Sequence, residues 1–203
     1  SIKIQLSTRP NPARKPACLA FHGAGGEQPG FLSSISALFE AHILISVSVD
    51  GQHSWNISNE GNNGQDIEAI KQIIAKVKLY TNVDTDRIRI LGLSNGGALA
   101  LRAAVEMDDA SVDVVCCIIS QTNTDQYRNN NFYYPSDETL TGDAYANDGY
   151  DTVQDSMPQR KILQLKGRSD TVVPYVGGDF AGLTFLSAED SAYALAQSQG
   201  YAG

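Results

Sequence analysis

Residues 87–97 read Arg-Ile-Arg-Ile-Leu-Gly-Leu-Ser-Asn-Gly-Gly, which joins the end of an apolar strand to the start of a helical pattern over 98–105. Ser94 stands at the apex of this turn, with Gly92 and Gly96 two residues to either side. A serine on so tight a turn takes strained backbone angles that push its hydroxyl out above the sheet, and the glycines let strand and helix pack closely. The helix start also directs N–H groups and a positive dipole end at that point, as a developing oxyanion requires. Ser94 is therefore the predicted nucleophile.

The composition describes an acidic chain that is large enough to bury one core. It has 203 residues, 42% of them hydrophobic, which predicts a single domain over residues 1–203. The formal net charge is −8, so nucleic acid and anionic membrane surfaces are poor partners. The sequence has no apolar stretch that is long enough to span a bilayer.

The three cysteines predict neither a disulfide nor a metal site. Cys116 and Cys117 are neighbours in an apolar run, and neighbours on one strand point to opposite faces, so they do not bond to each other. No pair of cysteines has the spacing of metal ligands, and no histidine is placed to complete a zinc site. We interpret all three, including Cys18, as small buried hydrophobes, and we expect no metal and no other cofactor.

Short apolar runs alternate with helical patterns along the chain. The strands expected from this alternation lie at 17–21, 43–49, 88–93, 112–119 and 161–165. The expected helices cover 31–39, 67–77, 95–107 and 187–199, with Asp66 and Ser187 as N-caps. The alternation predicts an α/β fold, a mostly parallel sheet with helices on both faces in a three-layer αβα sandwich.

Ligands of such sheets bind outside the carboxyl ends of the strands. Four loops leave those ends here, at 22–30, at 52–64, at the Ser94 turn and at 167–178. A further connection, 121–158, is long for a compact domain. It forms either a lid or aromatic binding surface, or a solvated loop; its aromatic residues are Tyr127, Phe132, Tyr133, Tyr134, Tyr145 and Tyr150.

The glycine-rich loop after the first strand reads His22-Gly23-Ala24-Gly25-Gly26. It is not the six-residue dinucleotide fingerprint, and it has no Lys-Ser/Thr for a phosphate-binding P-loop. Beside Ser94, it can supply one backbone N–H of an oxyanion hole, with the N–H that follows the nucleophile as the second. The predicted donors are the N–H groups of Ala24 and Asn95; the alternative is a plain strand-to-helix turn.

A serine nucleophile of this kind works with an acid and a histidine base, so we consider Asp170 and the three histidines of the sequence. Asp170 follows the strand at 161–165, in the chain order Ser then Asp, and is placed to orient a catalytic base; it could also cap a turn. His22, His42 and His53 all precede Ser94, whereas the base of such a sheet normally comes after the acid. No convincing base is found among these residues.

An ordered series of segments runs through nearly the whole chain. It comprises Phe21 to Gly26, Asp50-Gly51 with Trp55-Asn56, Asp66 at the start of a helix, Val83 to Ile88, Gly92 to Gly97, Gly167 to Asp170 with Val173-Pro174-Tyr175 and Gly177-Gly178, and Phe185-Leu186-Ser187. This series resembles the esterase and polyhydroxybutyrate-depolymerase group of the α/β-hydrolases, which includes feruloyl and acetylxylan esterases. The resemblance implies the α/β-hydrolase fold.

The resemblance also implies roles for individual residues. Ser94 would be the nucleophile and Asp170 the acid, Ala24 and Asn95 would donate to the oxyanion, and Trp55 would line the substrate cleft unless it is a core aromatic. Members of the group usually carry His at the position of Lys166, which is not the catalytic base. They also continue with a further strand and a loop that delivers the catalytic His, so we expect the base beyond Gly203 and an incomplete domain here.

The resulting expectation is a serine carboxylic-ester hydrolase that works through an acyl-enzyme on short-chain, feruloyl, acetyl or polyester substrates. One alternative is a related serine hydrolase of amide or peptide bonds, because the two classes share the same catalytic parts. Another is a catalytically inactive binding module that uses the same cleft. The resemblance favours an exported bacterial enzyme, although a cytoplasmic location stays open, as does the oligomeric state.

Overall fold

The computed structural model describes residues 13–48, 53–58, 60, 63–141, 145–180 and 182–201. Position 49, the last of the strand expected at 43–49, lies outside these residues. So do the Asp50-Gly51 pair of the resemblance and part of the loop expected at 52–64.

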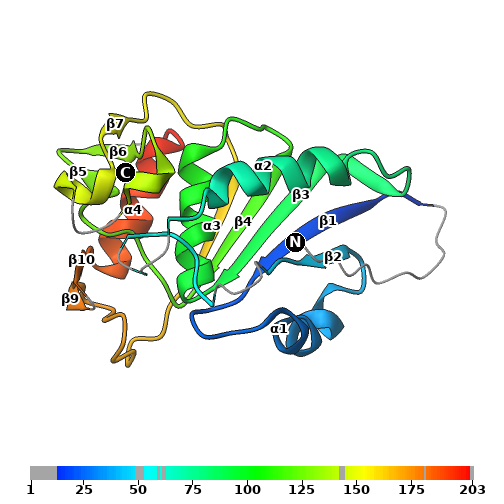
Figure 1. Ribbon diagram of the computed structural model, residues 1–203, viewed down its shortest axis with the longest axis horizontal. Coiled ribbons are helices and arrows are strands. Elements are labelled where there is room, and N and C mark those ends of the chain that lie inside the picture. The colour runs from blue at the N-terminus through cyan, green and yellow to red at the C-terminus, as the bar shows by residue number, and fades with distance from the viewer. Residues whose placement is uncertain are drawn as a thin grey trace.

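A five-stranded parallel sheet forms the centre of the molecule (Figure 1). Its spatial order is β2-β1-β3-β4-β8. The strands are β1 (Lys15–Phe21), β2 (Ile43–Ser46), β3 (Val83–Leu93), β4 (Val112–Ile118) and β8 (Lys161–Leu165). All five expected strands are present, and β3 starts five residues before the predicted 88 because Val83 pairs with Lys15 across a register shift.

Helices cover both faces of this sheet, and Figure 1 shows α1 and α2 on opposite sides of it. On one face, α2 (Asp66–Val77) and α3 (Asn95–Glu106) pack on Ala17, Leu19 and Phe21 of β1. On the other face, α1 (Gln28–Ile35) and the 3₁₀ turn Ser36–Phe39 pack on the residues of β1 in between. This alternation explains why the strand is apolar throughout, since each face of a covered parallel sheet must be buried.

The last helix is α4 (Ala188–Ser198), which packs beside α3 on the same face. Its predicted cap is confirmed, because the Ser187 hydroxyl accepts the Asp190 N–H at 3.0 Å. A hairpin of β9 (Gly178–Phe180) and β10 (Leu183–Phe185) precedes it. The other face of the edge strand β8 presents Leu163 and Leu165, which are 50% and 46% exposed.

The connection 121–158 is packed against the body of the protein, so the expectation of a solvated loop is wrong for its described residues. Three short strands, β5 (Tyr127–Arg128), β6 (Asn131–Tyr134) and β7 (Thr152–Val153), form a small antiparallel sheet. Two 3₁₀ turns, Glu138–Leu140 and Ala146–Gly149, lie between β6 and β7. Phe132 and Tyr150 are buried, and Tyr127 packs on the Phe132 ring at 4.7 Å between ring centroids.

The cysteines are free thiols. Cys18 and Cys117 are buried on opposite faces of the sheet, and burial raises the pKa of both thiols to about 12. They therefore pack as small apolar side chains, as the sequence indicated. None of the helices in the described part of the chain has the length and apolar character that crossing a bilayer requires.

Candidate active site

Ser94 lies on a sharp turn between β3 and α3. Its backbone angles are φ +54° and ψ −120°, an unfavourable combination for a residue with a side chain. The turn is held on both sides, because the Ser94 N–H donates to Ile118 O at 2.8 Å and the Ala98 N–H donates to Ser94 O at 2.9 Å. The strained apex predicted from the glycine spacing is thus present in the structure.

The two glycines that flank Ser94 are required by close backbone contacts. A Cβ atom at Gly92 would lie 1.8 Å from the Gly96 carbonyl oxygen. A Cβ atom at Gly96 would lie 2.4 Å from the carbonyl oxygens of both Phe21 and His22, at the end of β1. Strand, helix and the loop after β1 can meet at Ser94 only because these positions carry no side chain.

We expect Gly92→Ala to destabilise the protein by about 3 kcal/mol or more, or to prevent folding, because the contact is with backbone that cannot move aside. Urea unfolding followed by circular dichroism measures the change. Gly30→Ala in α1 is the matched control: a Cβ there meets nothing within 4 Å, and alanine favours the helix. Equal stability of the two variants would contradict the close packing at Gly92.

The glycine-rich loop passes directly beside Ser94. A Cβ atom at Gly23 would lie 3.2 Å from Ser94 Cβ and 3.9 Å from its Oγ. The loop is held by its own turn, in which the Gly26 N–H donates to Gly23 O at 3.0 Å. Gly25 has φ +73°, and its N–H donates to His53 O at 2.7 Å. Ala24 lies between these fixed points, so the structure brings its peptide to the same edge of the sheet as Ser94 and Asn95.

Trp55 lies beneath this loop. The residue is 4% exposed, and its ring meets the Phe21 ring edge-on, at 5.1 Å between centroids. The indole N–H donates to His22 O at 2.8 Å. This burial matches the core-aromatic alternative, and direct contact of Trp55 with substrate stays a prediction.

Asp170 lies in the loop after β8, separated from the Ser94 turn by β4 alone. Its Oδ1 accepts the N–H groups of Val172 and Val173, at 2.9 and 3.1 Å. Its Oδ2 accepts the Lys166 ammonium at 2.9 Å, and this bond lowers the pKa of the Asp170 carboxyl below its ordinary value. The carboxylate is therefore held ionised and oriented, and it caps its own turn, as one of the two sequence interpretations expected. Its role in orienting a catalytic base stays a prediction.

The fold is similar to that of several solved structures. No family model matches the sequence, and no curated protein matches it. Solved structures do match. A carboxylesterase from Bacillus cereus superimposes with a TM-score of 0.62 at 12% identity, over 98% of this chain and 81% of that one. A phospholipase/carboxylesterase from Dyadobacter fermentans gives 0.61 at 14% identity, over 98% and 83%. Esterase PE8 gives 0.59 at 12% identity, over 96% and 84%. The chain has the α/β-hydrolase fold.

Ser94 and Asp170 both lie at the carboxyl ends of strands of the parallel sheet. His42 precedes β2, so it lies at the opposite edge of the sheet, beside Arg89. His22 is buried, and its Nδ1 faces Gly23 O at 2.8 Å. His53 is exposed next to the glycine-rich loop. Within the described part of the chain, no hydrogen bond or ion pair joins any of these histidines to Ser94 or Asp170.

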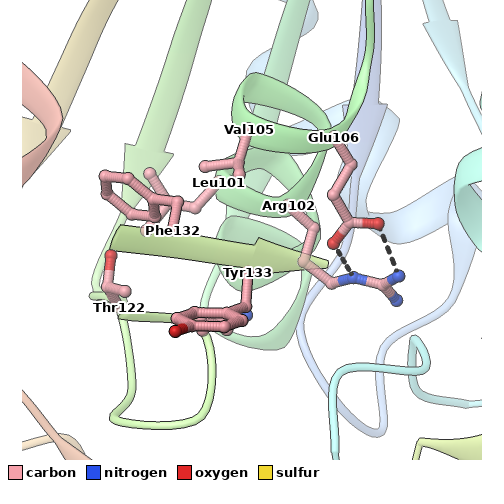
Figure 2. A pocket seen from close by; sticks show the side chains of 8 residues that line it. Leu101, Arg102, Val105, Glu106, Thr122, Phe132 and Tyr133 are labelled. Atoms are coloured by element: carbon pink, nitrogen blue, oxygen red, sulfur yellow. Dashed lines mark hydrogen bonds and ion pairs between the residues drawn. The ribbon is translucent and has the colours of Figure 1, made fainter. Parts of the chain in front are cut away.

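A buried polar network in α3, the helix that follows the Ser94 turn, was not predicted from the sequence. At its centre is Arg102 of α3, whose side chain is fully buried. It pairs with both oxygens of Glu106, at 2.7 and 2.8 Å, and with Glu138 at 3.2 Å; it also donates to the Asn56 carbonyl. Figure 2 shows the Arg102–Glu106 pair on α3, at a small cavity that Phe132 and Tyr133 of β6 also line. One signal was available: a charged pair at i and i+4 in an otherwise apolar helix.

Glu138 and Asp66 connect this network to α2. The Glu138 carboxylate accepts the N–H groups of Ile67 and Glu68, at 3.0 and 3.2 Å, and so caps the start of the helix. The prediction of Asp66 as N-cap is wrong: Gln65 is the N-cap, and Asp66 is the first helical residue. The Asp66 carboxylate instead turns away to accept the Asn56 N–H at 2.6 Å.

Replacing Arg102 with methionine is expected to cost about 3–5 kcal/mol of stability, because the buried Glu106 carboxylate and the partly buried Glu138 carboxylate would lose their cation. Urea unfolding at pH 7 measures the loss. Lys71→Gln is the control, since Lys71 and its partner Glu68 are 3.9 Å apart and about half exposed, and such pairs contribute less than about 1 kcal/mol. A loss at Arg102 no larger than at Lys71 would show that the network does not stabilise the fold.

Asp66 makes stability depend on pH. Burial raises its pKa from 3.8 to about 6, so the folded state retains the proton between these values while the unfolded state loses it. The contribution of Asp66 to the free energy of unfolding is therefore greatest below about pH 4. It falls by up to about 3 kcal/mol as the pH rises from 4 through 6. We expect Asp66→Asn to match the wild type at pH 4 and to exceed it by about 1–3 kcal/mol at pH 7.5. A difference in unfolding free energy that does not change with pH would contradict this assignment.

Proposed function

We propose that the protein is a serine carboxylic-ester hydrolase. The observation that carries this proposal is the position of Ser94, on a strained turn at the carboxyl end of β3 with the glycine-rich loop packed against it. Serines on strained turns of this kind, between a strand and a helix, are nucleophiles in the α/β-hydrolase fold. The fold that the chain shares with solved esterases supports the proposal.

In this proposal Ser94 Oγ attacks the ester carbonyl carbon and passes its proton to an imidazole. The N–H groups of Ala24 and Asn95 bind the negative oxygen of the tetrahedral intermediate. The C–O bond of the ester breaks, the alcohol leaves with the proton from the imidazole, and an acyl-enzyme remains. Water then repeats the sequence and releases the acid. No cofactor is required for these steps.

Asp170 orients the imidazole and stabilises its charged form. His22 and His42 are unsuited to this role by burial and by position. We place the imidazole on a segment outside these 203 residues, as the resemblance implies, and with it a further part of the domain. The substrates we expect are short-chain, feruloyl, acetyl or polyester esters, and the resemblance favours an exported enzyme.

Two other functions use the same site. A serine hydrolase of amide or peptide bonds would have the same nucleophile and oxyanion donors. A binding module without catalysis would lack a base, and general-base assistance contributes roughly 10²–10⁴-fold to such reactions.

Parallel assays on short acyl p-nitrophenyl esters and the matching anilides separate these functions in the full-length protein. We expect hydrolysis of the esters and little or none of the anilides. Labelling with a fluorophosphonate, followed by peptide mass spectrometry, should place the adduct on Ser94. Comparable rates on both substrates would favour the amide hydrolase, and absence of both hydrolysis and labelling would favour the binding module.

A further inference from the structure

The side chain of Asn95 is clamped onto the backbone of Trp55. Asn95 Oδ1 accepts the Trp55 N–H at 2.6 Å, and Asn95 Nδ2 donates to the Trp55 carbonyl at 3.1 Å. The side-chain amide thus pairs with both the backbone N–H and the backbone carbonyl of Trp55, in the way that the peptide group of a neighbouring β-strand would. Because both ends of the amide are engaged, its orientation is fixed, and with it the residue that directly follows Ser94.

Glu60 also holds the Asn95 side chain. Its Oε1 accepts Asn95 Nδ2 at 2.9 Å. Its Oε2 accepts the N–H groups of Ile57 and Ser58, at 2.9 and 2.7 Å, so the carboxylate also shapes the loop that contains Trp55. Every one of these bonds requires an acceptor oxygen, and two oxygens on one planar group supply them.

Trp55 extends the connection to the other side of the nucleophile. Its indole N–H holds the His22 carbonyl at the end of β1, two residues before Ala24. The neighbouring His53 carbonyl accepts the Gly25 N–H, one residue after Ala24. His53 and Trp55 therefore bind the glycine-rich loop on both sides of Ala24, while Trp55 also binds Asn95.

We propose that Glu60, the Asn95 side chain and Trp55 form a positioning brace, which fixes the backbone N–H donors of Ala24 and Asn95 relative to each other. This inference rests on the proposed ester hydrolase function. Glu60 and Trp55 are positioning residues that act through Asn95 and the glycine-rich loop. Oxyanion donors stabilise the transition state only when they are aimed at the place where the charge develops, so a loose brace lowers kcat and leaves substrate binding largely intact.

Glu60→Gln tests the brace because glutamine keeps the shape but has one carbonyl oxygen. If the glutamine oxygen faces the N–H groups of Ile57 and Ser58, the glutamine NH₂ group faces Asn95 Nδ2, and two donors cannot form a hydrogen bond. If it faces Asn95, the amide meets two backbone N–H groups. We expect kcat for p-nitrophenyl acetate to fall about 10- to 100-fold in the full-length protein, with KM changed less than about threefold. The rate of fluorophosphonate labelling should fall by a similar factor.

Trp55→Phe removes the indole N–H but keeps a ring in the core, and it tests the brace independently if Glu60→Gln fails to fold. It should lower kcat in the same way, and the double variant should lose little more than the worse single variant, because both act on one arrangement. Glu40→Gln is the control: Glu40 is exposed and precedes β2 at the opposite edge of the sheet, so its kcat should equal that of the wild type.

An unchanged kcat in folded Glu60→Gln or Trp55→Phe, or a loss confined to KM, overturns the brace. So do losses that multiply in the double variant. Ser94→Ala distinguishes this failure from failure of the proposed function. If Ser94→Ala abolishes hydrolysis while both brace variants keep full kcat, the brace alone is wrong. If Ser94→Ala retains hydrolysis, the proposed function fails and the brace with it.

Discussion

Ser94→Ala is expected to lower ester hydrolysis by at least about 10⁴-fold and to abolish fluorophosphonate labelling, because the acyl-enzyme can no longer form. The fold should survive, since the bonds that hold the turn are made by the backbone of residue 94, which the substitution keeps. The measurements are kcat/KM on p-nitrophenyl acetate in the full-length protein and adduct formation by intact mass.

The control for this substitution is Ser33→Ala. Ser33 is an exposed residue of α1, on the face of the sheet opposite α3, and it should label and turn over like the wild type. Residual hydrolysis by Ser94→Ala within tenfold of the wild type would remove Ser94 as the nucleophile. It would leave the strained turn without a catalytic explanation.

Asp170→Asn is expected to lower kcat by about 10³–10⁴-fold while KM changes little, because an amide can present its N–H groups to the imidazole and favour the wrong tautomer. In the protein itself, the Lys166 ammonium lowers the pKa of this carboxyl, so Asp170 stays ionised across the pH range of any activity governed by an imidazole. The acid limb of the pH profile should therefore report the imidazole.

Asp86→Asn is the matched control for Asp170→Asn. Asp86 is exposed in the first half of β3, towards the edge of the sheet that lies away from Ser94, and its replacement should leave kcat unchanged. An Asp170→Asn variant with wild-type kcat would show that another group orients the base, or that none does.

The sequence was informative where a structural requirement is local. The turn at Ser94 was predictable because the strained apex and the two glycines that it needs lie within five residues, and the structure shows both. The parallel sheet was predictable for a similar reason: strands buried on both faces read as continuous apolar runs. The α/β-hydrolase fold followed from the order of these segments.

The buried network could not be predicted, because its members are far apart in the sequence. Arg102 meets a carbonyl 46 residues before it and a carboxylate 36 residues after it. The cap of α2 was missed for the same reason. Asp66 directly precedes the apolar helical pattern, where a cap is expected, yet the carboxylate of Glu138, 71 residues beyond Ile67, accepts the Ile67 N–H instead. Strands of two residues, such as β5 and β7, carry no periodic pattern at all.

The cap that Glu138 places on α2 joins the connection 121–158 to the body of the protein. Its carboxylate holds the first N–H groups of the helix, and its backbone carbonyl accepts Asn56 Nδ2 at 2.8 Å. This part of the connection cannot swing away without fraying α2 and releasing the loop near Trp55. Amide hydrogen exchange should therefore report one common opening free energy for the start of α2 and the turn at Glu138–Leu140, as one cooperative unit would. We therefore expect the region around Glu138 to keep its position relative to the start of α2.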